Sequence, residues 1–113
     1  MPAVRLVEIP GTPALGVYTE ARFEETVQKM QEGIARGDMN QAAFRVFMAS
    51  VELARVDAQN RITLSARMRE RVGLDRQAHI VGMWNRLEIW NPDTFAETEE
   101  STVEAGVDMG QYL

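Results

Sequence analysis

The chain has 113 residues, no cysteine and a formal net charge of −5. A chain of this length forms one domain or two very small ones, and the lack of cysteine excludes disulfides and cysteine-based zinc sites. No stretch approaches the roughly eighteen apolar residues of a transmembrane helix, and the first residues lack a signal-peptide core. We therefore expect a soluble, intracellular protein, and because so short a chain buries little surface alone, we also expect it to oligomerise.

The first third of the chain predicts a β-hairpin followed by a helix. Residues 4–9 and 14–18 favour two strands around a Pro-Gly-Thr-Pro turn. Thr19 is placed to cap a helix whose apolar residues recur at steps of three and four, and Gly37 is placed to end it.

A second helix and a third strand are expected next. Asp38, with Gln41 three residues later, resembles a capping box, and the apolar residues that follow fall on one helical face. Two helices joined by one glycine form a helical hairpin. A strand over residues 50–56 is then expected to lead into a turn.

The segment that begins at Asp57 predicts this turn and a further short strand. Asp57 can close an Asx-turn on its own backbone, and Asn60 tolerates the left-handed conformation better than most residues. Residues 61–64 alternate polar and apolar side chains, which predicts a half-buried strand.

A short basic helix follows this strand. Ser65 is a suitable N-cap for a helix over residues 66–72, and Gly73 lies where a left-handed C-cap is expected. Between residues 55 and 76 there are six arginines and three acidic residues, a balance of +3, so the rest of the chain carries −8. A basic island in an acidic chain is typical of a phosphate-binding surface, although a solvated helix face gives the same count.

The last part predicts a second hairpin and a helix. Strands are expected over residues 78–83 and 87–90 around a turn at 84–86, and the sequence Asn-Pro-Asp from residue 91 is a strong helix start. From Glu97 onward the chain is acidic and poor in hydrophobic residues, which indicates a disordered or loosely attached tail.

The two predicted hairpins form an internal repeat. Residues 15–23 match residues 87–95 at a constant offset of 72, and the preceding strands match at the same offset, with Val7 and Ile9 against His79 and Val81. The equivalents of the Asp57 segment fall before Met1, so we expect one complete repeat and the second half of another. Strand residues of that half repeat would lack cover and leave an exposed edge: Leu6, Val7, Ile9, Leu15 and Val17.

Nothing in the sequence indicates catalysis. There is no pairing of nucleophile and base, no phosphate-binding glycine loop and no carboxylate pair beyond chance. His79 is the only histidine, and a lone histidine is a packed or surface residue far more often than a metal ligand or catalyst. Trp84 and Trp90 are best explained by turn-side and core packing, and a subunit contact is the alternative for Trp84. We expect no catalytic residue, metal, cofactor, small-molecule substrate or membrane partner.

The segment from Asp57 to Trp90 resembles the second half of the MraZ family of bacterial transcriptional regulators. The family pattern is an Asp-x-x-Gly-Arg turn, an aliphatic-Pro pair, a Leu-Arg pair in a helix, a Val-Gly strand and a closing Glu-Ile-Trp. The matching residues here lie in four groups: Asp57 to Arg61, Ile62 to Gly73, Val81-Gly82 and Glu88-Ile89-Trp90. The resemblance covers about residues 15–96. Asn60 stands in place of the turn glycine, Ser65 in place of the proline, and the first copy of the turn segment is missing.

This resemblance implies an α+β fold with swapped-hairpin, AbrB-like β-barrel units connected by a helical hairpin. It divides the chain into a partial N-terminal AbrB-like unit at 1–19, the helical hairpin at 20–48, a complete C-terminal AbrB-like unit at 49–96 and the acidic tail at 97–113.

The resemblance also implies a function. Its members are sequence-specific regulators that bind double-stranded DNA at short direct repeats in the promoter of the division and cell-wall gene cluster. We expect such a protein in the cytoplasm at the nucleoid, as a homo-oligomer that is ring-like if the first unit is complete. The implied DNA-binding residues are Asp57, Asn60, Arg61, Arg67, Arg69 and Arg71.

Two points stay open at this level. The residues alone favour a structural pairing of Arg61 with Asp57, whereas the resemblance favours a DNA contact. Arg67 and Arg71 share a helix face and Arg69 points elsewhere, so we expect only one or two of these near DNA. The alternative function is a protein-interaction module with little DNA binding of its own, either a truncated subunit that modulates a full-length relative or an AbrB-fold antitoxin.

Overall fold

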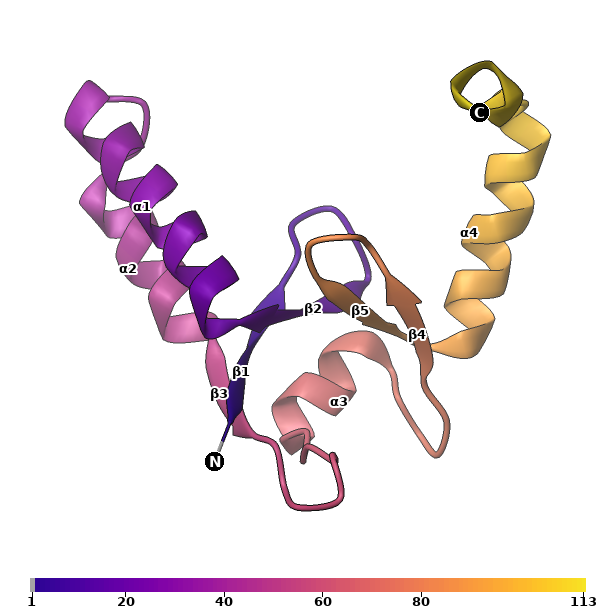
Figure 1. The fold of residues 1–113 in the computed structure, drawn as a ribbon, viewed down its shortest axis with the longest axis horizontal. Coiled ribbons are helices and arrows are strands. Elements are labelled where there is room, and N and C mark those ends of the chain that lie inside the picture. The colour runs from indigo at the N-terminus through magenta and orange to yellow at the C-terminus, as the bar shows by residue number, and fades with distance from the viewer. Residues whose placement is uncertain (1) are drawn as a thin grey trace.

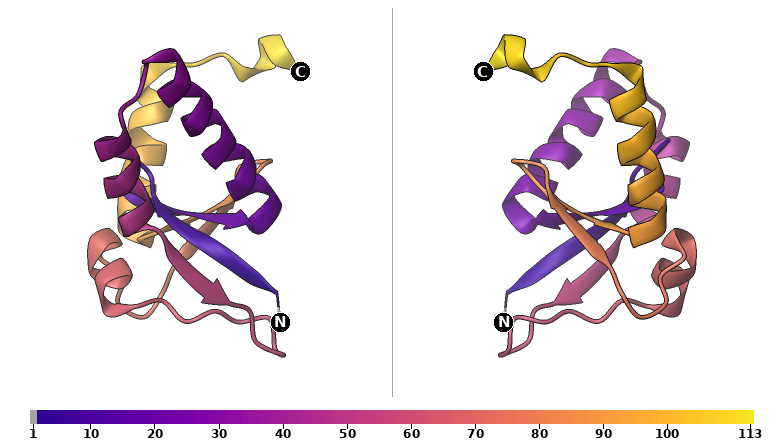
Figure 2. Two further views of the ribbon diagram at one scale, coloured as in Figure 1. Left: turned by 90° about the vertical axis from the view of Figure 1, so that its left-hand side faces the viewer. Right: turned by 90° about the vertical axis from the view of Figure 1, so that its right-hand side faces the viewer.

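The computed structural model describes residues 2–113, which form three layers: one antiparallel sheet lies between helices on its two faces (Figure 1). The strands are β1 (Ala3–Glu8), β2 (Ala14–Thr19), β3 (Glu52–Arg55), β4 (His79–Gly82) and β5 (Leu87–Trp90). The helices are α1 (Glu20–Arg36), α2 (Gln41–Ser50), α3 (Ala66–Val72) and α4 (Pro92–Ala105), followed by a short 3-10 helix, η1 (Met109–Tyr112). Helices α1, α2 and α4 lie on one side of the sheet and α3 lies on the other (Figure 2). The expected α+β class is confirmed.

The strand order is β3-β1-β2-β5-β4, and every neighbouring pair is antiparallel. The sheet is therefore continuous from the N-terminal hairpin to the C-terminal hairpin. Among residues 2–113, no helix is long and apolar enough to cross a bilayer.

Local capping chemistry sets most helix ends. The side chains of Thr19, Ser65 and Asn91 each accept a backbone N–H in the first turn of the helix that follows. Gly37 and Gly73 end α1 and α3 in the left-handed conformation, as expected.

The expected capping box at Asp38 and Gln41 is wrong. Asn40 caps α2, because its side-chain oxygen accepts the N–H of Ala43 at 2.7 Å. Asp38 is used by the end of α1 instead: its N–H donates to Gly33 O at 2.8 Å, and its carboxylate pairs with Arg36. Helix α2 also extends to Ser50, so the third strand begins two residues later than expected.

The main core lies between the sheet and α3. Its buried members are Leu6, Leu15, Ala54, Met68, Val72 and Ile89. We expected five residues of the N-terminal strands to be exposed. This expectation is wrong for three of them, since Leu6, Val7 and Leu15 are buried. The reason is that β1 lies between β2 and β3 rather than at an edge, and α3 covers it.

A smaller core lies on the opposite face of the sheet. Val7, Tyr18 and Phe23 are buried there, and Phe23 stacks on Phe47 of α2 with ring centroids 6.3 Å apart. The stacking joins α1 to α2, and the packing of Phe23 with Val7 of β1 and Tyr18 of β2 anchors the helical hairpin to the sheet.

Residues 61–64 do not form a strand, contrary to expectation. A strand needs a neighbouring strand to share its backbone hydrogen bonds, and this segment has no place in the sheet order. The predicted alternation still holds, because Ile62 and Leu64 pack against the main core.

The acidic tail is more ordered than expected. Helix α4 runs to Ala105 and η1 follows it, so the expectation of disorder from Glu97 is wrong. All residues from Glu97 to Leu113 are exposed, however, and α4 projects away from the sheet (Figure 1).

The internal repeat appears as an approximate two-fold relation between the two hairpins. Gly16 pairs with Glu88, its repeat equivalent, and the flanking pairs Leu15–Ile89 and Val17–Leu87 exchange equivalent positions. The axis therefore passes between β2 and β5.

The offset of 72 holds for the second strands but not for the first. Glu8 lies opposite Leu15 and Gly82 lies opposite Leu87, so the first strands correspond at an offset of 74. Arg5 and Val7, rather than Val7 and Ile9, match His79 and Val81. The turn of the first hairpin is two residues longer, which the sequence match did not include.

Candidate nucleic-acid interface

The loop between β3 and α3 is closed by Asp57. One carboxylate oxygen, Oδ1, accepts the backbone N–H of Gln59 at 2.9 Å and that of Arg61 at 2.8 Å. The backbone of Asp57 closes the loop a second time, since its N–H donates to Arg61 O at 2.9 Å and its carbonyl accepts the N–H of Asn60 at 3.0 Å. The expected Asx-type turn is present.

Asn60 adopts the left-handed conformation, with a φ of 60°. This is the position where the family pattern has glycine, and asparagine is one of the few other residues that adopt this conformation at low cost. The tight loop therefore forms without glycine.

The loop lowers the pKa of the Asp57 carboxyl below its ordinary value of 3.8. The main cause is the hydrogen bond from the Arg61 backbone N–H. Desolvation is the next largest effect and opposes it, and the hydrogen bonds from the Gln59 N–H and the Arg61 side chain lower the pKa further. Asp57 is thus a stable anion at neutral pH.

Arg61 projects from this loop into solvent. Its Nε donates to Asp57 Oδ2 at 3.2 Å, and its side chain is 71% exposed. Within residues 2–113, neither terminal nitrogen of the guanidinium has a hydrogen-bond partner. The loop lies at the end of the molecule opposite the tip of the helical hairpin and α4 (Figure 1). The structure therefore presents the guanidinium of Arg61 to solvent, in a fixed direction, at this end of the molecule.

Arg67 has a different environment. Its guanidinium donates to Ser50 O at 2.8 Å, to Glu52 Oε2 at 2.8 and 3.1 Å, and to Glu8 Oε1 at 3.3 Å. These partners belong to β1, α2 and β3, so Arg67 fastens α3 to the sheet. Little of its hydrogen-bonding capacity remains for another ligand.

Arg69 and Arg71 are also engaged, on different sides of α3. Arg69 donates to Leu64 O at 2.7 Å, which fixes the end of the loop to the helix. Arg71 lies 3.9 Å from Glu8, the carboxylate that Arg67 also contacts. The predicted division holds: Arg67 and Arg71 share a face and Arg69 points elsewhere.

The structure therefore brings together Asp57, Asn60 and Arg61 but not the three arginines of α3. Sequence reasoning missed Glu8 and Glu52, which neutralise part of the basic island from outside the segment counted. Two exposed arginines of that segment, Arg55 and Arg76, have no ion pair or hydrogen bond from their side chains within the described range. Exposure without partners is the structural signal that adds them as candidates.

The lone histidine and Trp90 agree with packing roles, whereas the expected packing role is wrong for Trp84. His79 stacks on Phe95 with ring centroids 4.4 Å apart, and buried Trp90 packs edge-on against the same ring while its indole N–H donates to Glu88. Trp84 lies exposed in the second turn. In the part of the chain described, no three His, Asp or Glu side chains gather into a possible metal site.

Comparison with known proteins gives consistent matches. A family model described as MraZ protein, putative antitoxin-like, matches residues 47–108. A protein named transcriptional regulator MraZ from Symbiobacterium thermophilum is 34% identical over 100 residues, which are 88% of this chain and 72% of that relative. A protein of the same name from Clavibacter michiganensis is 30% identical over 97 residues, 86% of this chain and 68% of the relative. Another, from Saccharopolyspora erythraea, is 33% identical over 79 residues, 70% and 55% of the two chains.

Proposed function

The chain belongs to the MraZ family of transcriptional regulators, whose fold is AbrB-like, and from that membership we propose that it binds double-stranded DNA through the loop from Asp57 to Arg61. Because its relatives are named transcriptional regulators, it is a regulator rather than an enzyme. One observation carries the proposal: the Arg61 guanidinium is exposed and is held by a loop whose geometry Asp57 fixes.

Arginine suits this role because its planar, permanently charged fork can take a phosphate or the O6/N7 edge of guanine with two parallel hydrogen bonds. The Asp57 bond uses only Nε. Both terminal nitrogens therefore stay available to DNA while the side chain keeps its direction.

The other basic residues divide into two roles in this proposal. Arg55 and Arg76 are exposed and add phosphate contacts. Arg67 and Arg69 are positioning residues, because they hold α3 and the end of the loop in place. Arg71 contributes charge beside Glu8. About three phosphate contacts per subunit give a slope near −3 in the dependence of log affinity on log salt.

So few contacts bind DNA weakly from a single subunit. A homo-oligomer facing several short direct repeats gains affinity through effective concentration, without new contacts. We propose that the chain acts in this way at the promoter of the division and cell-wall gene cluster, at the nucleoid. The net charge of −5 on the whole chain would disfavour non-specific adhesion.

The test is fluorescence anisotropy of the purified chain on a labelled duplex from its own upstream promoter region, with a shuffled duplex as control, over a range of salt. The proposal expects saturable, promoter-selective binding that weakens with salt. Equal affinity for both duplexes, from protein shown by circular dichroism to be folded, would contradict it.

A second candidate function is a protein-interaction module. It is favoured by one observation that is independent of the Arg61 loop: two apolar side chains of the sheet, Ile80 of β4 and Leu87 of β5, are 53% and 47% exposed.

A further inference from the structure

The tip of the Asp57 loop carries a further polar side chain beside Arg61. The residues of the tip are all exposed: Ala58, Gln59, Asn60 and Arg61. Gln59 has a long side chain that ends in an amide, with two N–H donors and a carbonyl acceptor. Within residues 2–113 this amide makes no hydrogen bond to the protein, and the bond that fixes the residue comes from its backbone N–H. The described part of the fold therefore does not use the Gln59 side chain.

One carboxylate oxygen holds Gln59 and Arg61 in a fixed relation. Asp57 Oδ1 accepts the backbone N–H of Gln59 at 2.9 Å and that of Arg61 at 2.8 Å. The residue between them, Asn60, donates its N–H to the carbonyl of Asp57 at 3.0 Å and has a φ of 60°. Because these three consecutive residues are all bound to one aspartate, the side chains of Gln59 and Arg61 leave the loop from a common frame.

This frame limits how far apart the two side chains can act. Consecutive Cα atoms lie about 3.8 Å apart, so the Cα atoms of Gln59 and Arg61 are separated by at most about 7 Å. Successive base pairs of DNA lie about 3.4 Å apart along the helix axis. A loop that brings Arg61 to the edge of one base pair therefore brings Gln59 within about two base pairs of it.

The chemistry of the amide favours one base. In the major groove, adenine presents the N7 acceptor beside the N6 amino donor, and a glutamine amide matches both: Oε1 accepts from N6–H and Nε2 donates to N7. A phosphate has only acceptors, so it would leave the Oε1 of Gln59 without a partner. Arg61, in contrast, has only donors and matches the two acceptors of guanine. The two side chains therefore differ in the base that each can read.

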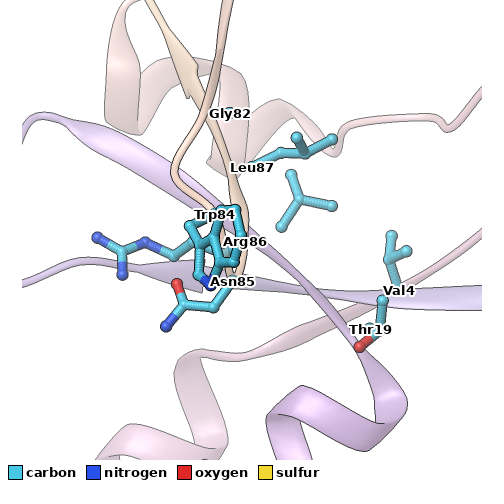
Figure 3. A pocket seen from close by; sticks show the side chains of 8 residues that line it. Val4, Thr19, Gly82, Trp84, Asn85, Arg86 and Leu87 are labelled. Atoms are coloured by element: carbon cyan, nitrogen blue, oxygen red, sulfur yellow. The ribbon is translucent and has the colours of Figure 1, made fainter. Parts of the chain in front are cut away.

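The turn between β4 and β5 also has an exposed amide beside an arginine, but its arginine has a structural role. Figure 3 shows Asn85 next to Arg86 in this turn. The Arg86 guanidinium donates to Glu88 Oε2 at 2.8 and 3.2 Å, and Glu88 is buried. Arg86 is thus bound to the sheet, whereas the terminal nitrogens of Arg61 have no partner within the described residues. Asn85 is therefore a matched control for Gln59.

We propose that Gln59 determines part of the sequence specificity of the loop, because its amide pairs with an adenine in the major groove within about two base pairs of the Arg61 contact. This inference rests on the proposed function and adds one base preference to it. Gln59 is neutral, so it contributes selectivity without changing the salt dependence of the affinity. Its substitution should also leave the loop intact, since only its backbone N–H bonds to Asp57.

The first test uses a set of duplexes from the upstream promoter region, each with one base pair changed, titrated by anisotropy. The wild-type chain should prefer adenine at one position by about tenfold, and Gln59→Ala should lose that preference alone. This position should lie within about two base pairs of the position whose preference Arg61→Ala loses. Asn85→Ala should keep every preference of the wild-type chain.

A change of specificity distinguishes base reading from a structural role. Gln59→Glu keeps the length of the side chain but leaves only acceptors, which suit the N4 amino group of cytosine. The preference at the same position should therefore change from adenine to cytosine, while the added negative charge lowers affinity for every duplex. Replacing the adenine by 7-deazaadenine, which lacks the N7 acceptor, should weaken binding of the wild-type chain and leave that of Gln59→Ala unchanged.

The outcomes separate this inference from the proposed function. If Gln59→Ala keeps the base preferences of the wild-type chain while Arg61→Ala loses selectivity, adenine reading by Gln59 is overturned and the DNA-binding role of the loop stands. An adenine preference that Asn60→Gly removes and Gln59→Ala keeps would assign the contact to the neighbouring amide and overturn the inference as well. If the folded wild-type chain prefers no base at any position, the proposed function and this inference both fail.

Discussion

The carboxylate of Asp57 holds Arg61 at two points: Oδ1 accepts its backbone N–H at 2.8 Å and Oδ2 accepts its Nε at 3.2 Å. The first contact fixes the loop and the second fixes the direction of the side chain. An exposed arginine normally loses rotamer freedom when it binds a ligand. Here part of that cost is met in the free protein, which favours Arg61 as a contact residue.

The Asp57 anion should make the stability of the loop depend on pH. Because the folded pKa lies below the ordinary value of 3.8, its contribution is fully present above that value and is lost as pH falls through the lowered folded pKa. Asp57→Asn should therefore be less stable than wild type at neutral pH, and the difference should shrink in acid. Urea unfolding of both proteins across this range measures it. A difference independent of pH would contradict the role given to the charge.

Arg67→Ala should destabilise the fold rather than remove a DNA contact. It leaves Glu8 and Glu52 without their main partner and frees α3 from the sheet. Since the Arg67 side chain is 51% exposed, solvent screening reduces the effect, and we expect a loss of about 1–2 kcal/mol in unfolding free energy.

The measurement for Arg67 is thermal and urea unfolding beside Arg67→Lys. Lysine lacks the planar fork and should restore stability only in part. Unchanged stability in Arg67→Ala would mean that the network does not hold α3 in solution.

The left-handed conformation of Asn60 predicts opposite outcomes for two substitutions. Asn60→Gly should be neutral or slightly stabilising, because glycine adopts a φ of 60° without a steric cost. Asn60→Val should cost about 1–2 kcal/mol, since a β-branched side chain clashes there. Chemical denaturation of the two variants provides the comparison, and equal stabilities would show that the loop does not keep this conformation.

Removing a buried methionine tests the core that supports the loop. Met68 is fully buried beneath the sheet, in contact with the core that Ile62 and Leu64 also join. Met68→Ala should cost about 2–5 kcal/mol, and Val103→Ala on exposed α4 should cost less than about 0.5 kcal/mol. A loss at Met68 as small as that at Val103 would place α3 off the sheet in solution.

Local features of the fold could be predicted from the sequence because their causes are local. Ser65 and Gly73 act on neighbouring backbone groups, so the ends of α3 were predictable. The turn at Asp57 is likewise closed by bonds within five residues.

The errors have causes that lie far apart in the sequence. Glu8 contacts Arg67 across 59 positions, so a count of charges within one segment overestimated the basic island. Residues 61–64 alternate like a strand but have no partner strand, which only the sheet order reveals. We expected the N-terminal strands to be exposed because β3 and α3 were assigned to the separate C-terminal unit. In the structure, β3 pairs with β1 and α3 packs against it.

The central claim is that Arg61 makes the selective DNA contact, and a matched pair of variants tests it most directly. Arg61→Ala removes an exposed arginine paired with Asp57, and Arg36→Ala removes an equally charged, exposed arginine paired with Asp38 near the tip of the helical hairpin. Both should leave the fold intact. The measurement is the anisotropy titration of each variant on promoter and shuffled duplexes at one salt concentration.

We predict that Arg61→Ala loses about 1–3 kcal/mol of promoter affinity and most of its selectivity over shuffled DNA. Arg36→Ala should keep the selectivity of the wild-type chain. If the two variants lose affinity equally on both duplexes, Arg61 contributes only general charge, and the loop from Asp57 to Arg61 is not the selective contact.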